Sequence, residues 1–378
     1  MYDTMKIGIL GGGQLGRMLL QEAANYPVET FVMENDPECP AAHLCHHFTK
    51  GNIKNYDDVL AFGKGLDVIT IEIEAVNVEA LETLESQGKT IIPKPSVLKT
   101  IKNKVLQKEF YKAQNIPSPD FVVTHSRGEL AQYTERLPAV HKIGEGGYDG
   151  RGVQLLHSVA DLPKGFDGPS VLENMVEIQT EIAVTVAIGL NGELAIFPPV
   201  EMIFDPYLNL LDYQLCPANI DEKIKWKAEA IAIQTAKAFG SAGLFAVEML
   251  VERNGNVWVN ETAPRVHNSG HHTIEAHTTS QYDMLWRIML NYPTGNTSML
   301  YPSALVNIIG EQGHSGKPHY EGLENILAME NVFVHIYGKH ETKPGRKMGH
   351  VTLLGRDRIE LNMKAKQVKE KIKIVSKS

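Results

Sequence analysis

Residues 248–261 read EMLVERNGNVWVNE, two apolar strand-like runs joined by Asn254-Gly255. Asn-Gly is the preferred two-residue loop of a β-hairpin, so this stretch predicts a pair of antiparallel strands. If these two residues alone form the loop, Glu248 faces Glu261 across the pair. Like charges directly opposite each other destabilise a sheet, so we expect a positive group between these carboxylates.

A divalent cation would supply that charge, and carboxylate oxygens are ligands that Mg2+ prefers. The hairpin therefore predicts a magnesium site at Glu248 and Glu261. Two solvated glutamates on an exposed face are the alternative, and the spacing leaves both open. Alternation along the second strand places Asn260 on the opposite face from Glu261, so the spacing does not predict that Asn260 contributes.

A glycine-dense loop, GEGGYDGRG, occupies residues 144–152 between two strand-like runs. Successive backbone N–H groups of such a loop can cradle phosphate oxygens, and its glycines allow it to move as a lid. Lys142 precedes it, where an ammonium group can meet a nucleotide phosphate. The Walker pattern G-x-x-x-x-G-K-[ST] is absent from the sequence, and a flexible surface loop is the alternative.

Two later segments concentrate cationic side chains. APRVHNSGHH, residues 263–272, follows the glutamate pair directly and carries Arg265 and His267. GKHETKPGRKMGH, residues 338–350, is a loop whose cations are Lys339, Lys343, Arg346 and Lys347. Arg and Lys at this density bind phosphate groups, and a solvated loop is the alternative.

The N-terminal run KIGILGGGQLGRML, residues 6–19, fits G-x-G-x-x-G between an apolar strand and a helix. Glu34 ends the next apolar run, roughly where a dinucleotide-binding fold places its ribose-binding acid. Residues 5–93 alternate between strand and helix patterns, which predicts a parallel sheet covered by helices. We do not interpret this unit as a nicotinamide site, because the rest of the chain carries a different nucleotide site.

Patterns of apolar residues predict the remaining elements. A long helix is expected over residues 96–115, capped by Ser96 and ended by the prolines of IPSPD. Strands are expected at 121–126, 139–143, 153–158 and 170–175, and a hairpin at 181–197. An amphipathic helix is expected at 221–240, and the chain after residue 301 turns strand-rich and ends in a basic tail.

Composition limits the class of protein. The 378 residues are 43% apolar and 22% charged, which indicates a globular protein of two or three domains. The net charge of -8 argues against a nucleic-acid partner, and no apolar run is long enough for a membrane span. Three cysteines without a C-x-x-C pair favour reduced thiols and a cytoplasmic setting. For the cluster His43, His46 and His47 we favour a surface or packing role over a metal site.

Several motifs together resemble one family. Lys142, GGYDGRG, the run 173–176 (ENMV) with Glu181, and the pair Glu248/Glu261 resemble the ATP-grasp fold. GGGQLGRM, NETAPRVHNSGHHTIEA, TSQYD and KPGRKMGHVTLLG are similar, in order and over nearly the whole chain, to the family of 5-(carboxyamino)imidazole ribonucleotide synthases. The resemblance implies a Rossmann-like parallel-sheet domain (1–95), an ATP-grasp domain (96–300, with a lid subdomain at about 120–188) and a small β-rich C-terminal domain (301–378).

The resemblance also implies a reaction, that of an ATP-dependent carbon–nitrogen ligase of purine biosynthesis. ATP phosphorylates bicarbonate to carboxyphosphate, which carboxylates the exocyclic amine of 5-aminoimidazole ribonucleotide and releases phosphate. The expected cofactor is Mg2+, with ATP as co-substrate and without nicotinamide or biotin. A homodimer is expected, without nucleic-acid or membrane partners.

The family pattern assigns roles to individual residues. Those expected to contact ATP are Lys104, Lys142, Gly147, Tyr148, Asp149, Gly150, Arg151, Gly152, Glu173, Asn174, Met175, Val176, Glu181, Asn260 and Glu261. Those expected to act in catalysis are Tyr148, Asp149, Arg151, Arg265 and His267, with Glu248 and Glu261 as metal ligands. Those expected to hold the ribonucleotide are Gln14, Leu15, Glu74, Asn268, Lys339, Arg346 and Lys347.

Two positions depart from the family pattern. Phe204 stands where the family often has a histidine, and Glu145 places a negative charge beside the expected phosphates. The resemblance implies that the opening glycines face the acceptor substrate and that Glu34 is only a strand-end carboxylate. The alternatives are another purine ATP-grasp ligase, such as a formate-dependent glycinamide ribonucleotide transformylase, a nicotinamide oxidoreductase, or a nucleotide-binding regulatory module without turnover.

Overall fold

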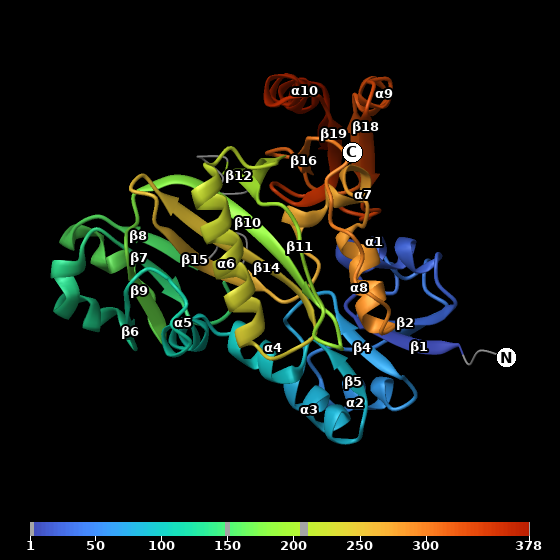
Figure 1. Ribbon diagram of the computed structural model, residues 1–378, viewed down its shortest axis with the longest axis horizontal. Helices are drawn as coiled ribbons and strands as arrows, with labels where there is room; N and C mark the ends of the chain where they lie inside the picture. The colour runs from blue at the N-terminus through green and yellow to red at the C-terminus, as the bar shows by residue number, and fades with distance from the viewer. Residues whose placement is uncertain (1–3, 148–151, 205–210, 378) are drawn as a thin grey trace.

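The computed structural model describes residues 4–147, 152–204 and 211–377. Figure 1 shows a parallel N-terminal sheet (blue), a large antiparallel sheet that runs through the middle of the molecule, and a small sheet (green) at the opposite end. The C-terminal elements (red) include the strands β19 and β18 at one edge of the large sheet.

Five parallel strands in the order β3-β2-β1-β4-β5 form the N-terminal sheet, as the sequence predicts. Their bounds are Met5–Leu10 (β1), Val28–Glu34 (β2), His47–Lys50 (β3), Val68–Ile71 (β4) and Thr90–Ile92 (β5). The strand order reverses at β1, and the carboxyl end of that strand is where open α/β sheets place their ligand. The glycine turn at residues 11–13 leads from this point into α1 (Gln14–Ala23).

The strand β3 is absent from the sequence prediction, because its side chains are largely exposed and form no apolar run. It begins at His47, which pairs with Glu29, while the ring of His46 contacts Thr30. Both side chains thus contact the neighbouring strand β2, which agrees with the surface role and not with the helix-packing alternative.

The single long helix predicted over residues 96–115 is wrong. The chain forms two helices there, α4 (Pro95–Ile101) and α5 (Lys104–Ala113). Asn103 separates them, because its side chain accepts hydrogen bonds from the amides of Val105 and Leu106 and so starts a new helix. Ser96 lies inside α4 and does not cap it. The other helices of this half are α2 (Tyr56–Gly63) and α3 (Val78–Ser86).

The four strands predicted between residues 121 and 175 are confirmed. They are β6 (Phe121–Thr124), β7 (Ala139–Ile143), β8 (Val153–Leu156) and β9 (Ser170–Asn174), in the order β6-β9-β7-β8. Two 3-10 segments, η1 (Arg127–Arg136) and η2 (Val159–Lys164), pack against each other beside this sheet. The glycine loop connects β7 to β8, as expected for a lid.

Nine strands form the large sheet, in the order β15-β14-β10-β12-β13-β16-β19-β18, with β11 paired to β10. Their bounds are Ile178–Ile188 (β10), Leu194–Ile196 (β11), Val200–Phe204 (β12), Leu211–Cys216 (β13), Gly243–Glu252 (β14), Val257–Ala263 (β15), Ser303–Ile309 (β16), Val332–Ile336 (β18) and Lys347–Leu354 (β19). The sheet thus contains β10, from the end of the expected lid subdomain, and three strands from beyond residue 301. The domain limits themselves stay predictions.

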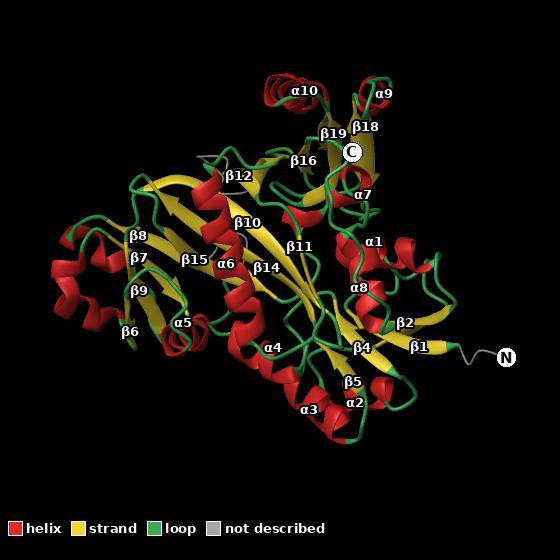
Figure 2. Cartoon of the chain, in the orientation of Figure 1, coloured by secondary structure: helices red, strands yellow, loops and turns green. Residues whose placement is uncertain are grey.

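The amphipathic helix α6 (Glu222–Ala238) lies across the large sheet, as Figure 2 shows. Phe245 and Val247 of β14 pack in the core beneath this helix, whereas Leu244, which precedes them, belongs to a different core. Because side chains alternate along a strand, Glu248 points away from α6. The carboxylate of Glu248 therefore lies on the face of the large sheet that α6 does not cover.

The hairpin β14–β15 has a different turn from the predicted one. Val251 pairs with Val257, and the amide of Glu252 donates to the carbonyl of Asn256, so three residues form the loop. Its last residue, Gly255, has a φ of 83°, the left-handed conformation that such loops require.

A β-bulge follows between the pair Glu248/Glu261 and the pair Met249/Val259. It shifts the register by one residue and restores the predicted opposition of the two glutamates. The bulge also brings Asn260 onto the same side as Glu261, which simple alternation did not predict.

The chain after residue 301 contains helices as well as strands. The expected basic tail is mostly the helix α10 (Arg358–Lys371), which packs on β16 and β19. The remaining elements are η3 (Asn268–Gly270), α7 (Thr273–Ala276), α8 (Gln281–Met289), β17 (Pro318–Glu321), α9 (Leu323–Leu327) and β20 (Lys373–Ser376). Among the described residues, no helix is long and apolar enough to cross a membrane.

One hydrophobic core joins the N-terminal sheet to the large sheet. Trp286 of α8 is fully buried in it, and its indole N–H donates to the carbonyl of Leu19 in α1 at 2.7 Å. The same core contains Ile7 of β1 and Leu244 of β14. These contacts fix the glycine turn relative to the carboxylate hairpin.

Replacing Trp286 with alanine should therefore destabilise the protein strongly. We expect a loss of about 3–5 kcal/mol in the free energy of unfolding, from the cavity and the lost hydrogen bond. The matched control is Trp226→Ala on α6, where the side chain is 63% exposed and the change should stay within about 0.5 kcal/mol. Urea denaturation followed by circular dichroism measures both, and equal losses would contradict the role of Trp286.

Candidate active site

A cavity of about 1980 Å³ lies between the three sheets. Every predicted site residue that the structure describes contributes to its lining. Tyr148, Asp149, Gly150 and Arg151 of the lid lie outside the described residues. The cavity thus unites two ends, one at the hairpin and lid, the other at the glycine turn.

The opposed carboxylates lie at the centre of this cavity. Lys104 forms an ion pair with Glu261, and His267 Nε2 lies 3.5 Å from Glu248 Oε1. The charge of Lys104 holds the pKa of Glu261 below its usual value. Burial, followed by the charge of Glu261, raises the pKa of Glu248. A positive group does therefore meet one member of the pair, as the opposed charges require.

A hard cation fits the oxygen atoms found here. Glu248 and Glu261 are directly paired across the strands, and the bulge brings the amide of Asn260 to the same side. Carboxylate and amide oxygens are the donors of magnesium sites. This donor set agrees with the predicted metal ligands, whose role stays a prediction.

Two lysines bind one buried glutamate beside the hairpin. Glu173 Oε2 lies 2.9 Å from Lys142 Nζ, and Glu173 Oε1 lies 3.5 Å from Lys108 Nζ. Lys142 Nζ also donates to Asn260 Oδ1 at 2.7 Å. Glu173 is 2% exposed, and its predicted contact with the nucleoside competes with these two ion pairs. Glu173 and Asn260 together orient the ammonium group of Lys142 towards the hairpin.

The start of the glycine loop is anchored to neighbouring segments. Gly144 donates its amide to the carbonyl of Pro169 and accepts from the amide of Lys104. Glu145, the expected disturbance beside the phosphates, accepts a hydrogen bond from Asn103 Nδ2 at 3.0 Å. Its charge is therefore partly engaged by the cap of α5. Phe204, the other departure, lines the cavity at the end of β12.

The residues expected to contact the nucleoside lie at the end of β9 and in the chain that follows it. Asn174 accepts a hydrogen bond from Arg136 at 2.9 Å, and residues 174–176 line the cavity. Glu181 follows on β10, where burial raises the pKa of its carboxyl group. The structure thus places this predicted group in the lining of the cavity that also contains Lys142.

The glycine turn holds two of the protein's own carboxylates. Glu72 Oε1 accepts a hydrogen bond from the amide of Leu15 at 3.1 Å, and Glu34 Oε2 accepts from Gly12 at 3.2 Å. A Cβ atom on Gly13 would lie 2.4 Å from Glu72 Oε1, so glycine is needed there for close approach. The amides that would bind a pyrophosphate are thus already used, which argues against a dinucleotide. Glu34 was expected to be only a strand-end carboxylate, but it also accepts a hydrogen bond from the glycine turn.

An ion pair connects the two ends of the cavity. Arg265 Nε, from the segment after β15, lies 2.9 Å from Glu74 Oε1, which follows β4. Asn268, three residues further, donates to Asn307 Oδ1 at 3.0 Å. Gln14 and Leu15 line the same end. The predicted catalytic arginine is therefore fixed at the boundary between the nucleotide side and the glycine turn.

The C-terminal cations border this end of the cavity. Lys339 Nζ donates to the carbonyl of Lys347 at 2.7 Å, and Arg346 donates to the carbonyl of Glu341 at 2.8 Å. All three predicted phosphate-binding side chains line the cavity, whereas Lys343 is not among its lining residues. Their convergence agrees with an anionic ligand at this end.

Sequence patterns missed three residues of the site. Glu72 lies in an apolar stretch and Lys108 in a helix with several other charges, and the importance of both follows only from contacts between distant segments. His271 also lines the cavity, and its ring contacts the hydroxyl of Tyr282. A lysine one helical turn after Lys104 was the only available signal for Lys108.

Lys108 provides a test through the pH dependence of stability. Burial lowers the pKa of Lys108 to about 8, whereas lysine in an unfolded chain keeps a pKa of about 10.4. Between these pH values the unfolded chain binds more protons, so stability rises with pH. Relative to Lys108→Met, we expect the unfolding free energy to rise by about 3 kcal/mol across this range.

The matched control for this experiment is Lys112→Met, which removes an exposed lysine of the same helix. It should retain the wild-type slope in pH-dependent urea denaturation. A wild-type slope in the Lys108→Met protein would contradict the burial of a weakly basic lysine.

Comparisons with known proteins agree with this geometry. Three family models match in chain order: a ribonucleotide synthetase preATP-grasp domain (residues 4–102), an ATP-grasp domain (109–282) and a phosphoribosylaminoimidazole carboxylase C-terminal domain (303–364). The chain spans 36% of a bifunctional purine synthesis protein of Dictyostelium discoideum and 65% of a chloroplastic phosphoribosylaminoimidazole carboxylase of Vigna aconitifolia, each 34% identical over more than 90% of this chain.

Several similar proteins match over nearly their whole length as well as that of this chain. The N5-carboxyaminoimidazole ribonucleotide synthase of Bacillus subtilis is 31% identical over 93% of this chain and 92% of its own. The crystal structure of the Thermotoga maritima synthetase has 38% identity and a TM-score of 0.92, and covers 99% of this chain and 100% of its own. The Aspergillus clavatus synthase in complex with ADP and 5-aminoimidazole ribonucleotide has 32% identity and a TM-score of 0.89, over 98% and 99%. The chain belongs to the N5-carboxyaminoimidazole ribonucleotide synthase family, whose members have the ATP-grasp fold.

Proposed function

We propose that this protein carboxylates 5-aminoimidazole ribonucleotide with bicarbonate at the expense of ATP. The products are 5-(carboxyamino)imidazole ribonucleotide, ADP and phosphate, in purine biosynthesis. One observation carries the proposal: a single cavity joins the carboxylate–lysine cluster to the glycine turn and the C-terminal cations. The relative from Aspergillus clavatus was crystallised with ADP and this ribonucleotide, which supports the same pair of ligands here.

The first half of the reaction transfers the γ-phosphoryl group of ATP to bicarbonate. Positioning and charge neutralisation supply most of the catalysis of such a transfer. Lys104 and Lys142 meet the phosphates, while Glu248, Glu261 and Asn260 hold Mg2+. The ion, when bound, neutralises phosphate charge. With Glu261 holding the ion, Lys104 would exchange this carboxylate for a phosphate oxygen as its partner.

The second half transfers the carboxyl group of carboxyphosphate. The exocyclic amine attacks the carboxyl carbon, the bond to the phosphate oxygen breaks, and the amine loses a proton as phosphate leaves. Arg265 and His267 lie between the two ends of the cavity and orient the carboxyphosphate. Tyr148, Asp149 and Arg151 belong to the lid that excludes water from this labile compound.

The acceptor binds at the glycine turn. Gln14, Leu15, Glu74 and Asn268 contact its base and ribose, and Lys339, Arg346 and Lys347 bind its phosphate. A homodimer is part of the proposal by analogy with the family, and a cytoplasmic setting rests on the three free cysteines. Neither nicotinamide nor biotin has a part in this reaction.

The decisive experiment measures ADP release with Mg-ATP, bicarbonate and 5-aminoimidazole ribonucleotide, omitting each in turn. ADP release should require the ribonucleotide, and labelled bicarbonate should enter an acid-labile product. Replacing Glu261 with glutamine should lower kcat by at least about 1000-fold, because a metal ligand is lost. The exposed Glu177→Gln serves as the control. Formate-dependent turnover of glycinamide ribonucleotide would instead favour the transformylase.

Arg346 tests the acceptor phosphate site separately. Arg346→Ala should raise the KM for 5-aminoimidazole ribonucleotide by roughly 10–100-fold, since a charge-assisted contact to phosphate is worth about 1.5–3 kcal/mol. The KM for ATP should change little. The control is Arg356→Ala, whose side chain is 92% exposed. Equal increases in both KM values would contradict the assignment of Arg346.

A further inference from the structure

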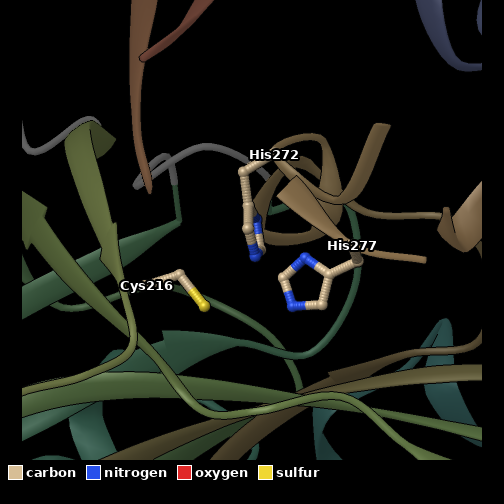
Figure 3. A group of neighbouring side chains, drawn as sticks. All are labelled: Cys216, His272 and His277. Carbon is tan, nitrogen blue, oxygen red and sulfur yellow. The ribbon is translucent and has the colours of Figure 1, made fainter. Parts of the chain in front are cut away.

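Cys216, His272 and His277 form a compact buried group outside the catalytic cavity. One potential ligand atom from each lies within 4.8 Å of the others, and the group is the only such cluster of three among the described residues. Figure 3 shows the thiol and the two imidazole rings pointing towards one another. Cys216 ends β13, whereas His272 and His277 flank α7. Two segments far apart in the sequence thus converge on one point.

Three of the four ring nitrogens in this group have no hydrogen-bond partner in the described part of the protein. His272 Nε2 and both ring nitrogens of His277 are buried without a hydrogen-bond partner. The two histidines are 2% and 4% exposed, and Cys216 is 1% exposed. An unpaired buried polar group costs about 1–3 kcal/mol, so this cluster requires an explanation.

We propose that Cys216, His272 and His277 bind a single zinc ion. A thiolate and two imidazoles are typical zinc ligands, and three protein donors leave one tetrahedral position for a water molecule. Zn–S and Zn–N bonds of about 2.3 and 2.1 Å bring the donors to roughly 3.3–3.6 Å from one another. The donor atoms lie within 4.8 Å of one another, so side-chain movements of about 1.5 Å or less would bring them to these distances. The ion displaces the thiol proton of Cys216, which is released to solvent.

The surroundings favour a soft metal at this position. His272 Nδ1 already lies 3.0 Å from the amide nitrogen of Gln214, which leaves Nε2 as the nitrogen for the ion. Such outer contacts orient the rings of metal-binding histidines. Cys216 also belongs to an apolar cluster with Val200 and Met202. This dry shell with sulfur and nitrogen donors differs from the oxygen donors of Glu248 and Glu261, which suit Mg2+.

The proposed ion has a structural consequence for the catalytic cavity. His272 follows the segment that carries Arg265, His267 and Asn268, and the metal would fasten the end of this segment to β13. Because the site is buried, the ion is bound as the chain folds. The proposal does not depend on the identity of the substrate.

The test is the metal content of the full-length protein produced with zinc in the growth medium and purified without chelators. Mass spectrometry should find one zinc per chain in the wild type and less than a tenth of that in Cys216→Ser. Cys39→Ser, which changes another buried free cysteine, should retain the metal. Glu261→Gln should also retain it, which separates this site from the catalytic one.

Cobalt provides a readout of the thiolate bond. Wild type produced in cobalt medium should show thiolate-to-cobalt charge-transfer absorption, and Cys216→Ser should lose it. His277→Gln offers a second variant if Cys216→Ser does not fold, with circular dichroism as the check. Zinc-free wild type without the cobalt band would overturn the proposal, as would equal zinc in wild type and both variants. Copper bound in place of zinc under these conditions would overturn the choice of metal.

Discussion

Two glutamates that face each other across an antiparallel pair are the constraint around which the cavity is organised. Burying two carboxylates side by side is unfavourable, because both desolvation and repulsion oppose their ionisation. The protein answers with cations from different parts of the fold: Lys104 from α5 pairs with Glu261, and His267 approaches Glu248. The opposed charges therefore connect elements that the chain order keeps apart.

Other cations near the hairpin are also paired with carboxylates. Lys142 is held by Glu173, and Arg265 is held by Glu74. Lys104, Lys142 and Arg265 thus each have a carboxylate partner in the free protein. This arrangement keeps the cations in place without ligand, and it lets a phosphate oxygen replace a carboxylate as partner at little cost in unpaired charge.

Local signals in the sequence predicted most of the elements and their types. Apolar patterns predicted four of the five N-terminal strands, the four strands between residues 121 and 175, and the pairs β10–β11 and β14–β15. They missed β3, which is largely exposed, and also β12 and β13. The hairpin prediction shows the limit: the loop has three residues instead of two, and the bulge near Asn260 compensates for the difference. The facing glutamates were therefore predicted correctly from an incorrect register. The bulge has no signature in the sequence pattern, and the role of Lys108 depends on packing against Glu173, which lies more than 50 residues away in the chain.

The glycine turn shows how one local motif serves a different chemistry. A helix N-terminus after a G-x-G-x-x-G turn offers unpaired amides that attract an anion, and in dinucleotide-binding proteins that anion is a pyrophosphate. Here Glu72 and Glu34 accept from those amides instead. The close approach of Glu72 to Gly13 explains the glycine without any nucleotide. With its amides already paired, the turn is a rigid support that presents Gln14 and Leu15 to the cavity. The motif therefore predicts the backbone geometry, and the residues facing it decide the ligand.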